Sequence, residues 1–241
     1  MPRTLNATRT VGVHRVHRVH RAYRAHRAHR ANTAVDTVNP ARDTRTRILA
    51  AAATEFGARG FSATSVDCIA RRARVNKAMI YYHFDHKRAL YAAILNEIYT
   101  GLGDRLRDVA ARPLPPDERL DRLIDTLVHA LDEGGPFLPM FLRELAEGGE
   151  HLGRDELRLI AGIFATVTGV IADGVRAGAF RPVHPALAYF SLVGPLIMFR
   201  ATAPVRARIR HLRDANMPDA DSATVASHLR MVAHRMLVPA T

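Results

Sequence analysis

The sequence predicts an all-α protein, with a small N-terminal helical domain followed by a larger helical body. Apolar residues recur at spacings of three and four through most of the chain, as they do in amphipathic helices that pack on a core. Glycine and proline clusters separate these segments, and no segment alternates apolar and polar residues as a half-buried strand would. With 241 residues, 48% of them apolar, the chain is long enough to bury one large core or two small ones.

Two short helices joined by a tight turn are predicted between Thr64 and Lys87. The apolar stripe of the first helix consists of Val66, Ile69, Ala70 and Ala73. Asn76 is a favourable N-cap for the second helix, in which Ile80 and Phe84 lie four residues apart on one face. The outward side of the second helix carries Lys77, Met79, Tyr82 and His83. This mixture of a cation, hydrogen-bonding rings and a flexible apolar group suits a DNA groove, which has phosphate walls and base edges on its floor.

A supporting helix is predicted before this pair. Asp43 or Thr44 can cap it, and Gly57 and Gly60 supply its end. Its buried stripe is predicted to consist of Ile48, Leu49, Ala52, Ala53 and Phe56, while Arg45, Arg47 and Glu55 stay outside. Thr64 then lies at the N-terminus of the next helix, where its hydroxyl and the free backbone N–H groups are expected to face a phosphate.

A longer helix begins at Lys87 and runs towards Pro113. Its first turn is expected to contact a DNA phosphate through Lys87. Its far end is expected to pack in the body, so that a movement of this helix changes the separation of two recognition helices. The body helices that follow are predicted at about 116–133, 137–145, 155–177, 186–203 and 221–237.

The helix at 186–203 is apolar on nearly every side, with Pro195 expected to kink it and Pro204 to end it. Such a helix must be covered all round, and in a chain of this size a second subunit is the natural cover. The arginine-rich connector at 205–213 lacks interleaved aromatic residues and an apolar stripe. It is therefore predicted to be a solvated loop or helix end rather than a second DNA site.

The positive charge lies almost entirely in the first third of the chain. Residues 1–42 hold nine arginines against one aspartate, and residues 43–88 hold nine basic against four acidic residues. Of the total charge of +12, these segments carry +8 and +5, which leaves −1 for the remainder. A basic N-terminal module joined to a near-neutral body is the electrostatic pattern of a nucleic-acid binder whose second half has another task.

Residues 1–41 are predicted to be a disordered, basic, low-complexity tail. Between positions 13 and 31 a small apolar residue, a His or Tyr, and an Arg repeat every three positions, a period that matches neither a helix face nor a strand. The tail could bind phosphates beside an operator as a basic arm. Its five histidines, His14, His17, His20, His26 and His29, could bind a metal loosely. The interpretation that we favour is a solvated tail without function, or the product of a start codon assigned too early.

A dense set of residues between Asp43 and Leu90 is spaced as in a known protein family. The set comprises Arg47-Ile48-Leu49, Ala52-Ala53, Phe56, Gly60-Phe61, Ala63-Thr64-Ser65-Val66, Ile69-Ala70, Tyr81, His83-Phe84, Lys87 and Ala89-Leu90. The segment resembles the N-terminal domain of the TetR/AcrR family of bacterial transcriptional repressors. The resemblance implies a helix-turn-helix whose second helix enters the major groove, on an all-helical homodimer with a ligand-binding C-terminal domain. It also implies that the last two helices pair with their copies in a four-helix dimer interface.

These observations divide the chain into a tail at 1–41, a helix-turn-helix DNA-binding domain at 42–102, and a helical ligand-binding and dimerisation domain at 103–241. The helix-turn-helix itself is placed at about 65–84. The predicted DNA-binding residues are Thr64, Ser65, Asn76, Lys77, Met79, Tyr81, Tyr82, His83 and Lys87. A small-molecule effector is expected in the body, where candidate lining residues are Phe137, Met140, Phe141, Phe164 and Phe190. These five are equally consistent with an ordinary core, and the default ligand is mostly apolar.

The helix-turn-helix departs from the family pattern at two positions. Arg74 stands where the family usually has a glycine with positive φ, at a cost of about 1 kcal/mol, so the turn is expected to be strained or rearranged. Ala78 stands where a glycine is frequent, which stiffens the second helix but can hold its backbone slightly further from DNA. Cys68 is interpreted as a small filler in preference to a redox switch, with Arg71 and Arg72 as its nearest cationic neighbours in sequence.

Together these features predict a sequence-specific transcriptional regulator, a homodimeric repressor that a ligand releases from a palindromic operator. The alternative is an architectural protein that coats DNA without sequence choice, although such a protein would not need a near-neutral body. An enzyme is disfavoured, because the chain has no glycine-rich phosphate loop, no G-x-S-x-G or H-E-x-x-H motif, and scattered body histidines. We therefore predict no catalytic residue, cofactor or metal site. One cysteine, no apparent signal peptide and no run of eighteen apolar residues predict a cytoplasmic protein without a membrane span.

Overall fold

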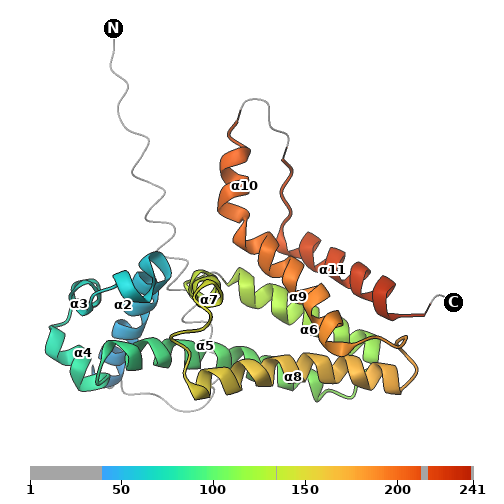
Figure 1. Cartoon of the computed structure of the whole chain (residues 1–241), viewed down its shortest axis with the longest axis horizontal. Helices are drawn as coiled ribbons and strands as arrows, with labels where there is room; N and C mark the ends of the chain where they lie inside the picture. Colours follow the sequence, from blue (N-terminus) through green and yellow to red (C-terminus); the bar gives the residue numbers. More distant parts are fainter. Residues whose placement is uncertain (1–39, 134, 213–216, 240–241) are drawn as a thin grey trace, which may run out of the picture. The chain divides into compact units, whose positions relative to one another are not determined.

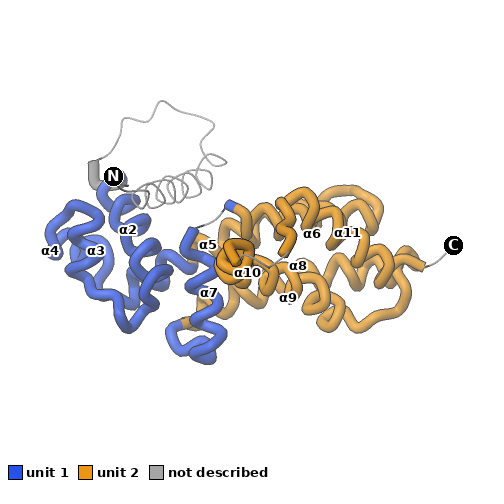
Figure 2. The backbone as a smooth tube through the Cα atoms, turned by 90° about the horizontal axis from the view of Figure 1, so that it is seen from above, with its two compact units in different colours: residues 1–95, 133–151 blue, residues 96–132, 152–241 orange. Residues whose placement is uncertain are grey.

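The computed structural model describes residues 40–133, 135–212 and 217–239, and in these ranges every regular element is an α-helix (Figure 1). The predicted all-α fold class is confirmed. The chain divides into two compact units (Figure 2). Unit 1 consists of residues up to Leu95 together with Glu133–His151, and unit 2 consists of Asn96–Asp132 together with the residues from Leu152 onward. The predicted tail lies outside the described residues, apart from its last two, which belong to the first described helix.

Unit 1 contains α2 (Pro40–Ala63), α3 (Val66–Ala73), α4 (Lys77–His83), the first part of α5 (Lys87–Ala110) and α7 (Phe137–Ala146). The bounds of α3 and α4 agree with the sequence prediction. Helix α2 begins before the predicted cap, so Asp43 lies in its first turn. Gly57 remains helical, and the helix breaks at Gly60, whose φ of 82° lies in the left-handed region that glycine adopts without strain.

Helix α7 packs against the end of α2. The break at Gly60 ends the regular hydrogen-bond ladder of α2, and the last carbonyls of a helix need other donors. Arg143 of α7 supplies them: its guanidinium donates to the carbonyl oxygens of Phe56 at 3.1 Å, Gly57 at 2.7 Å and Ala58 at 3.0 Å. Unit 1 therefore includes a segment that the sequence division placed in the C-terminal domain.

The turn between α3 and α4 contains a residue in the left-handed conformation. Arg74 has φ 55° and ψ 47°, and it is the one non-glycine residue with positive φ in the described ranges. The N–H of Val75 donates to the carbonyl of Ala70 at 3.1 Å, as in a Schellman helix end. Arg47 of α2 fastens the turn by donating to the carbonyls of Ala73 at 2.7 Å and Arg74 at 3.0 Å. The turn thus has the geometry of a regular Schellman helix end and is not rearranged. The backbone strain is confined to Arg74.

Unit 2 contains the rest of α5 with α6 (Pro116–Asp132), α8 (Arg154–Arg176), α9 (Pro185–Ala201), α10 (Ala203–Ile209) and α11 (Ser222–Leu237). Helix α6 packs on α8, α9 and α11, and its pairing with α11 includes an ion pair of Asp125 with Arg230. The arginine-rich connector forms the short helix α10, bent by 49° from α9. One of its arginines, Arg206, lies over the ring of Phe199 at 3.8 Å and also pairs with Asp219.

One described helix, α8, is long and apolar enough to cross a membrane by length and composition, as is the bent pair α9–α10. In unit 2, α8 packs against α6 and α9. Its buried face includes Ile163, Val167, Val170 and Ile171, which is the environment of a core helix. Packing within unit 2 thus accounts for part of the apolar surface of α8.

Replacing Arg74 with glycine is expected to stabilise unit 1. A residue with a Cβ atom is strained in the left-handed region and glycine is not, so the free energy of unfolding should rise by about 0.5–1 kcal/mol. The midpoint of urea or thermal unfolding measures the change. Arg74→Ala is the matched control, because it removes the same charge but keeps the Cβ atom, and it should bring no gain. A lower midpoint for Arg74→Gly than for the unmodified chain would contradict the interpretation.

Candidate nucleic-acid interface

Helices α3 and α4 form a helix-turn-helix with a side-chain cap on each helix. The hydroxyl of Ser65 accepts a hydrogen bond from the N–H of Cys68 at 3.2 Å, and the amide oxygen of Asn76 accepts from the N–H of Met79 at 2.8 Å. These bonds satisfy backbone donors that a helix start otherwise leaves open. The inward residues of α3 are buried, and Ile80 anchors α4. Folding thus leaves most of α4 on the surface.

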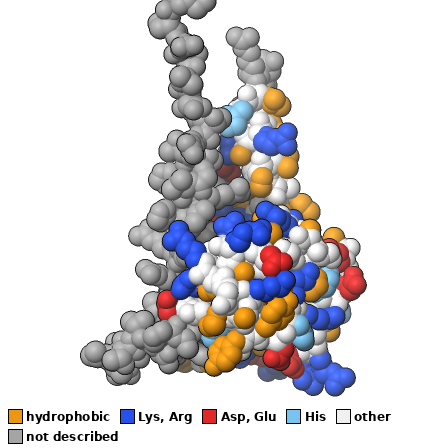
Figure 3. Space-filling view, turned by 90° about the vertical axis from the view of Figure 1, so that its left-hand side faces the viewer, with side chains coloured by type: hydrophobic (Ala, Val, Ile, Leu, Met, Phe, Trp, Pro, Cys, Tyr) orange, Lys and Arg blue, Asp and Glu red, His pale blue; other side chains and the backbone are white. Residues whose placement is uncertain are grey.

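The outer face of α4 presents most of the predicted base-reading side chains. Tyr82 is 78% exposed, which is the highest value among the exposed large apolar and aromatic residues, and Tyr81 beside it is also exposed. Lys77 is exposed and pairs with Asp67 of α3 at 3.1 Å, while Met79 and His83 are half-buried. The view from this side shows Lys and Arg side chains spread over the surface with apolar side chains between them (Figure 3). Such a surface can pair with phosphates and contact base edges.

Thr64 does not have the predicted environment. It is 1% exposed, and its hydroxyl donates to the carbonyl oxygens of Gly60 at 2.7 Å and Glu55 at 3.2 Å. Its own N–H donates to the carbonyl of Phe61 at 3.2 Å. The Thr64 hydroxyl is therefore not directed at a phosphate in this conformation, because the break in α2 creates acceptors that a sequence pattern does not reveal. The predicted phosphate contact of the backbone N–H groups at the start of α3 stays a prediction.

Lys87, at the start of α5, bonds to the segment before α3. Its ammonium donates to the carbonyls of Phe61 at 3.0 Å and Thr64 at 3.1 Å, and it lies 4.2 Å from the centre of the Phe61 ring. An ammonium group has three donors, so one is left for a phosphate. Lys87 thus holds the entrance to α3, and its predicted phosphate contact can involve only the remaining donor.

Two arginines of α2 were predicted only to lie outside, yet they contact the helix-turn-helix. Arg47 bonds to the turn at Arg74, and Arg45 lies 5.2 Å from the ring centre of Phe84, at the end of α4. Both contacts join residues more than 25 positions apart in the sequence, so no helical periodicity reports them. The one available signal was that two basic residues precede the buried stripe of the supporting helix.

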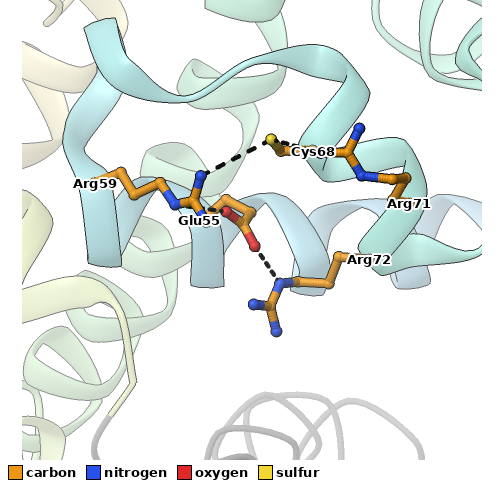
Figure 4. Close-up of a pocket in the computed structure, with 5 residues that line it drawn as sticks. All are labelled: Glu55, Arg59, Cys68, Arg71 and Arg72. Carbon is orange, nitrogen blue, oxygen red and sulfur yellow. Dashed lines mark hydrogen bonds and ion pairs between the residues drawn. The ribbon is translucent and has the colours of Figure 1, made fainter.

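An open hollow of about 360 Å³ lies between α2 and α3, and it is lined by Glu55, Arg59, Cys68, Arg71 and Arg72 (Figure 4). Glu55 was predicted to stay outside, but it is 4% exposed. Its carboxylate pairs with Arg72 and, at 3.3 Å, with Arg59. The charge of Glu55 is therefore buried beneath two guanidinium groups that themselves stay exposed, at 55% for the Arg59 side chain and 42% for that of Arg72. The polar character of Glu55 alone did not indicate this position.

The thiol of Cys68 lies in this hollow beside two guanidinium groups. Arg71 approaches the sulfur to 3.1 Å and Arg59 to 3.9 Å. The pKa of the Cys68 thiol is lowered, first by the hydrogen bond with Ser65 and then by the charges of Arg71 and Arg59. The thiolate form of Cys68 is thus favoured by its surroundings, whereas the sequence interpretation treated Cys68 as a small filler without such stabilisation.

The predicted effector-lining residues fall into both units. Phe137 and Phe141 of α7 stack with ring centres 5.7 Å apart in unit 1, where Met140 is buried. Phe164 and Phe190 lie 6.0 Å apart in unit 2, and both contact the ring of Tyr189. The structure therefore groups the five residues as two sets, and their role in ligand binding stays a prediction.

Cys68 is expected to react with alkylating agents at lower pH in the folded protein than in the unfolded chain. The lowered pKa means that the thiolate persists to lower pH when Ser65, Arg71 and Arg59 surround the sulfur. The pH dependence of the iodoacetamide reaction rate, with and without urea, measures this difference. Arg71→Gln should move the folded-state midpoint part of the way back. Identical midpoints for folded and unfolded chains would count against the assigned environment.

Comparisons with known proteins agree with this geometry. Residues 48–94, which contain α3 and α4, match the family model described as bacterial regulatory proteins, tetR family. The chain is 31% identical over 156 residues to the HTH-type transcriptional repressor KstR2 of Rhodococcus jostii, and this alignment covers 60% of the chain and 74% of that protein.

Two solved structures illustrate the similarity of fold. The ketosteroid transcriptional regulator KstR2 of Mycobacterium tuberculosis has a TM-score of 0.64 at 21% identity, over 81% of this chain and 95% of that one. FadR from Bacillus subtilis, in complex with stearoyl-CoA, has a TM-score of 0.60 at 14% identity, over 78% of this chain and 96% of that one. The family match, the related repressor and the exposed helix-turn-helix together place this chain in the TetR family of DNA-binding bacterial transcriptional regulators.

Proposed function

We propose that this regulator is a homodimeric repressor that binds a palindromic operator through α4 and is released from it by a small-molecule ligand. The observation that carries the DNA-binding part is the outer face of α4, where Lys77, Tyr81 and Tyr82 are exposed. Asn76 caps this helix, and Arg47 holds the turn before it. In the proposed complex Lys77, Met79 and Tyr82 read base edges. Ser65, Asn76, Tyr81, His83 and the third donor of Lys87 lie along the phosphates.

The exposed face of α9 supports the dimer. The residues Leu187, Phe190, Ser191, Gly194, Pro195 and Met198 are all exposed and recur at spacings of three and four, so they form one continuous stripe. Three large apolar side chains in this stripe, Leu187, Phe190 and Met198, are each more than 60% exposed. An apolar stripe of this kind is expected to be covered by another surface, and a two-fold copy of the same stripe is self-complementary.

Symmetry connects the dimer to the operator. Two copies related by a two-fold axis present two recognition helices in opposite orientations, so the preferred DNA site has two inverted half-sites. A ligand that favours a conformation with mismatched spacing lowers DNA affinity, and DNA lowers ligand affinity by the same factor. We propose an apolar effector and a cytoplasmic location. One structural neighbour is a ketosteroid transcriptional regulator and another was solved with stearoyl-CoA, and a steroid skeleton and a stearoyl chain are both apolar.

The base-reading role of α4 is tested with an operator selected from a random duplex library. Tyr82→Ala should weaken binding to the preferred operator by roughly 10- to 100-fold and relax the base preference at the contacted position, because it removes the most exposed ring of α4. Titrations against single-base operator variants measure both effects.

Tyr81→Phe is the matched control, since it keeps the ring and removes only a hydroxyl. It should weaken binding evenly over the operator variants, as expected for a phosphate contact. The same loss of base preference in both variants would refute the division of roles. A wild-type protein that prefers no sequence over bulk DNA would refute operator recognition and favour the DNA-coating alternative.

The dimer is tested at Met198, which is 63% exposed in the α9 stripe. Met198→Glu should convert dimers into monomers, because two carboxylates would be brought into an apolar interface. Analytical ultracentrifugation measures the mass, and operator binding should be lost at concentrations at which the unmodified protein binds.

Leu145→Glu is the control, because Leu145 is similarly exposed, at 61%, but lies on α7 in unit 1. This variant should remain a dimer and keep its operator affinity. A Met198→Glu protein that stays dimeric, or an unmodified protein that binds its operator as a monomer, would rule out the α9 interface.

A further inference from the structure

The turn after α7 brings together a histidine and two glutamates that the sequence did not connect. Glu144 lies near the end of α7, Glu147 is its C-terminal cap, and His151 follows a turn with two glycines in the left-handed conformation, Gly148 and Gly149. All five residues belong to unit 1. One side-chain ligand atom from each of Glu144, Glu147 and His151 lies within 4.8 Å of the other two. We call these three residues the α7 cluster.

The spacing within the α7 cluster is close to that of a metal site. The Nδ1 atom of His151 is 3.2 Å from Oε1 of Glu144 and 3.3 Å from Oε2 of Glu147. With metal–ligand bonds of about 2.0–2.2 Å, neighbouring ligand atoms of a tetrahedral site lie roughly 3.3–3.6 Å apart. A cation could therefore be bound by all three groups after small side-chain adjustments.

The Nδ1 atom of His151 lacks a hydrogen-bond partner among the described residues. His151 is 8% exposed, and this nitrogen is buried with no hydrogen-bond partner among the described residues, although two carboxylate oxygens lie near it. A proton on Nδ1 could serve only one of the two oxygens at a time. A buried ring nitrogen that faces two carboxylates without a hydrogen bond to either is the arrangement expected of a ligand set.

The charge balance also favours a cation. Glu144 is 2% exposed, and in the described part of the chain its one ion-pair neighbour is His151. With a neutral His151 ring, the carboxylate of Glu144 is a buried charge without a cationic partner among the described residues, which is costly. A divalent cation on a neutral imidazole and two carboxylates makes the cluster neutral.

The neighbouring groups hold the ligands in place. The hydroxyl of Tyr91 donates to Oε1 of Glu144 at 2.7 Å, and the backbone N–H of His151 donates to Oε2 of Glu144 at 3.2 Å. The ring of His151 lies 4.3 Å from that of Phe61, between centres. Hydrogen bonds of this kind orient metal-binding carboxylates and raise the affinity of metal sites.

We propose that Glu144, Glu147 and His151 bind a divalent first-row transition metal, with Zn²⁺ as the representative ion. One imidazole with two carboxylates suits Zn²⁺ and its neighbours in the series better than Mg²⁺ or Ca²⁺, which prefer oxygen ligands alone. Three protein ligands leave a fourth position for water or a further ligand on the side of Glu147, the exposed member. The bound ion joins the end of α7 to His151, whose ring packs beside that of Phe61.

The experiment uses the full-length chain with its five tail histidines replaced by asparagine, so that His14, His17, His20, His26 and His29 contribute no metal sites. Zn²⁺ binding is measured by titration calorimetry, and the ligand type by the visible absorption of Co²⁺. We expect one ion per chain, a Co²⁺ spectrum without a sulfur-to-metal band, and a thermal midpoint that Zn²⁺ raises and a chelator lowers.

Glu147→Gln is the main variant, because Glu147 is 43% exposed and its replacement should leave the fold intact. It should weaken Zn²⁺ binding at least tenfold and abolish the Zn²⁺-dependent rise of the thermal midpoint. Glu150→Gln is the matched control: it removes an exposed carboxylate next to His151 but outside the cluster, and should behave like the parent. His151→Asn should abolish binding if it folds.

The proposal is overturned if the parent binds no Zn²⁺, or if Glu147→Gln and Glu150→Gln bind it equally. It is also overturned if Co²⁺ shows thiolate ligation, which would place the ion at Cys68. None of these readouts requires operator DNA, so they are independent of the proposed repressor function.

Discussion

The carbonyl groups at the end of α2 are the acceptors on which unit 1 depends. Because Gly60 leaves the helical conformation, the ladder stops there, and side chains from other elements replace its missing donors. Arg143 bonds to three carbonyls before the break, Thr64 bonds across it, and Lys87 bonds to two carbonyls after it. These bonds attach α7 and α5 to α2 and fix the point from which α3 begins. The start of α3 thus depends on the backbone conformation of one residue, Gly60.

The arginines and lysines of the DNA-binding unit are not all available to DNA. The segment 43–88 carries a formal charge of +5, but Arg47 is bound to backbone carbonyls, Arg72 pairs with the buried Glu55, and Lys87 has one free donor. The cations near α4 that remain available to DNA are therefore fewer than the charge count indicates. Since counterion release scales with the phosphates neutralised, the salt dependence of DNA binding should reflect these fewer cations.

Local patterns in the sequence predicted most of the helices, and long-range contacts account for most of the errors. The apolar stripe of α3 and the cap at Asn76 predicted both helices of the helix-turn-helix to within one residue, Phe84 being the extended cap after α4 rather than part of it, because both signals lie within one helix turn of the structure they determine. Glu55 and Thr64 were misplaced because their partners, Arg72 and the Gly60 carbonyl, are created by the tertiary fold. The α7 cluster was missed for the same reason: His151 was one of several scattered histidines until the turn at Gly148 brought it back to Glu144.

The discontinuity of unit 1 has a consequence for the order in which the chain is made. The ribosome releases α2, α3 and α4 long before Arg143, because the whole of α6 must be synthesised between them. Until Arg143 has emerged, the end of α2 lacks its arginine donors, and until His151 has emerged, its ring cannot pack beside that of Phe61. A nascent helix-turn-helix is therefore incomplete for much of translation, and a fragment that ends with α5 remains in that state permanently.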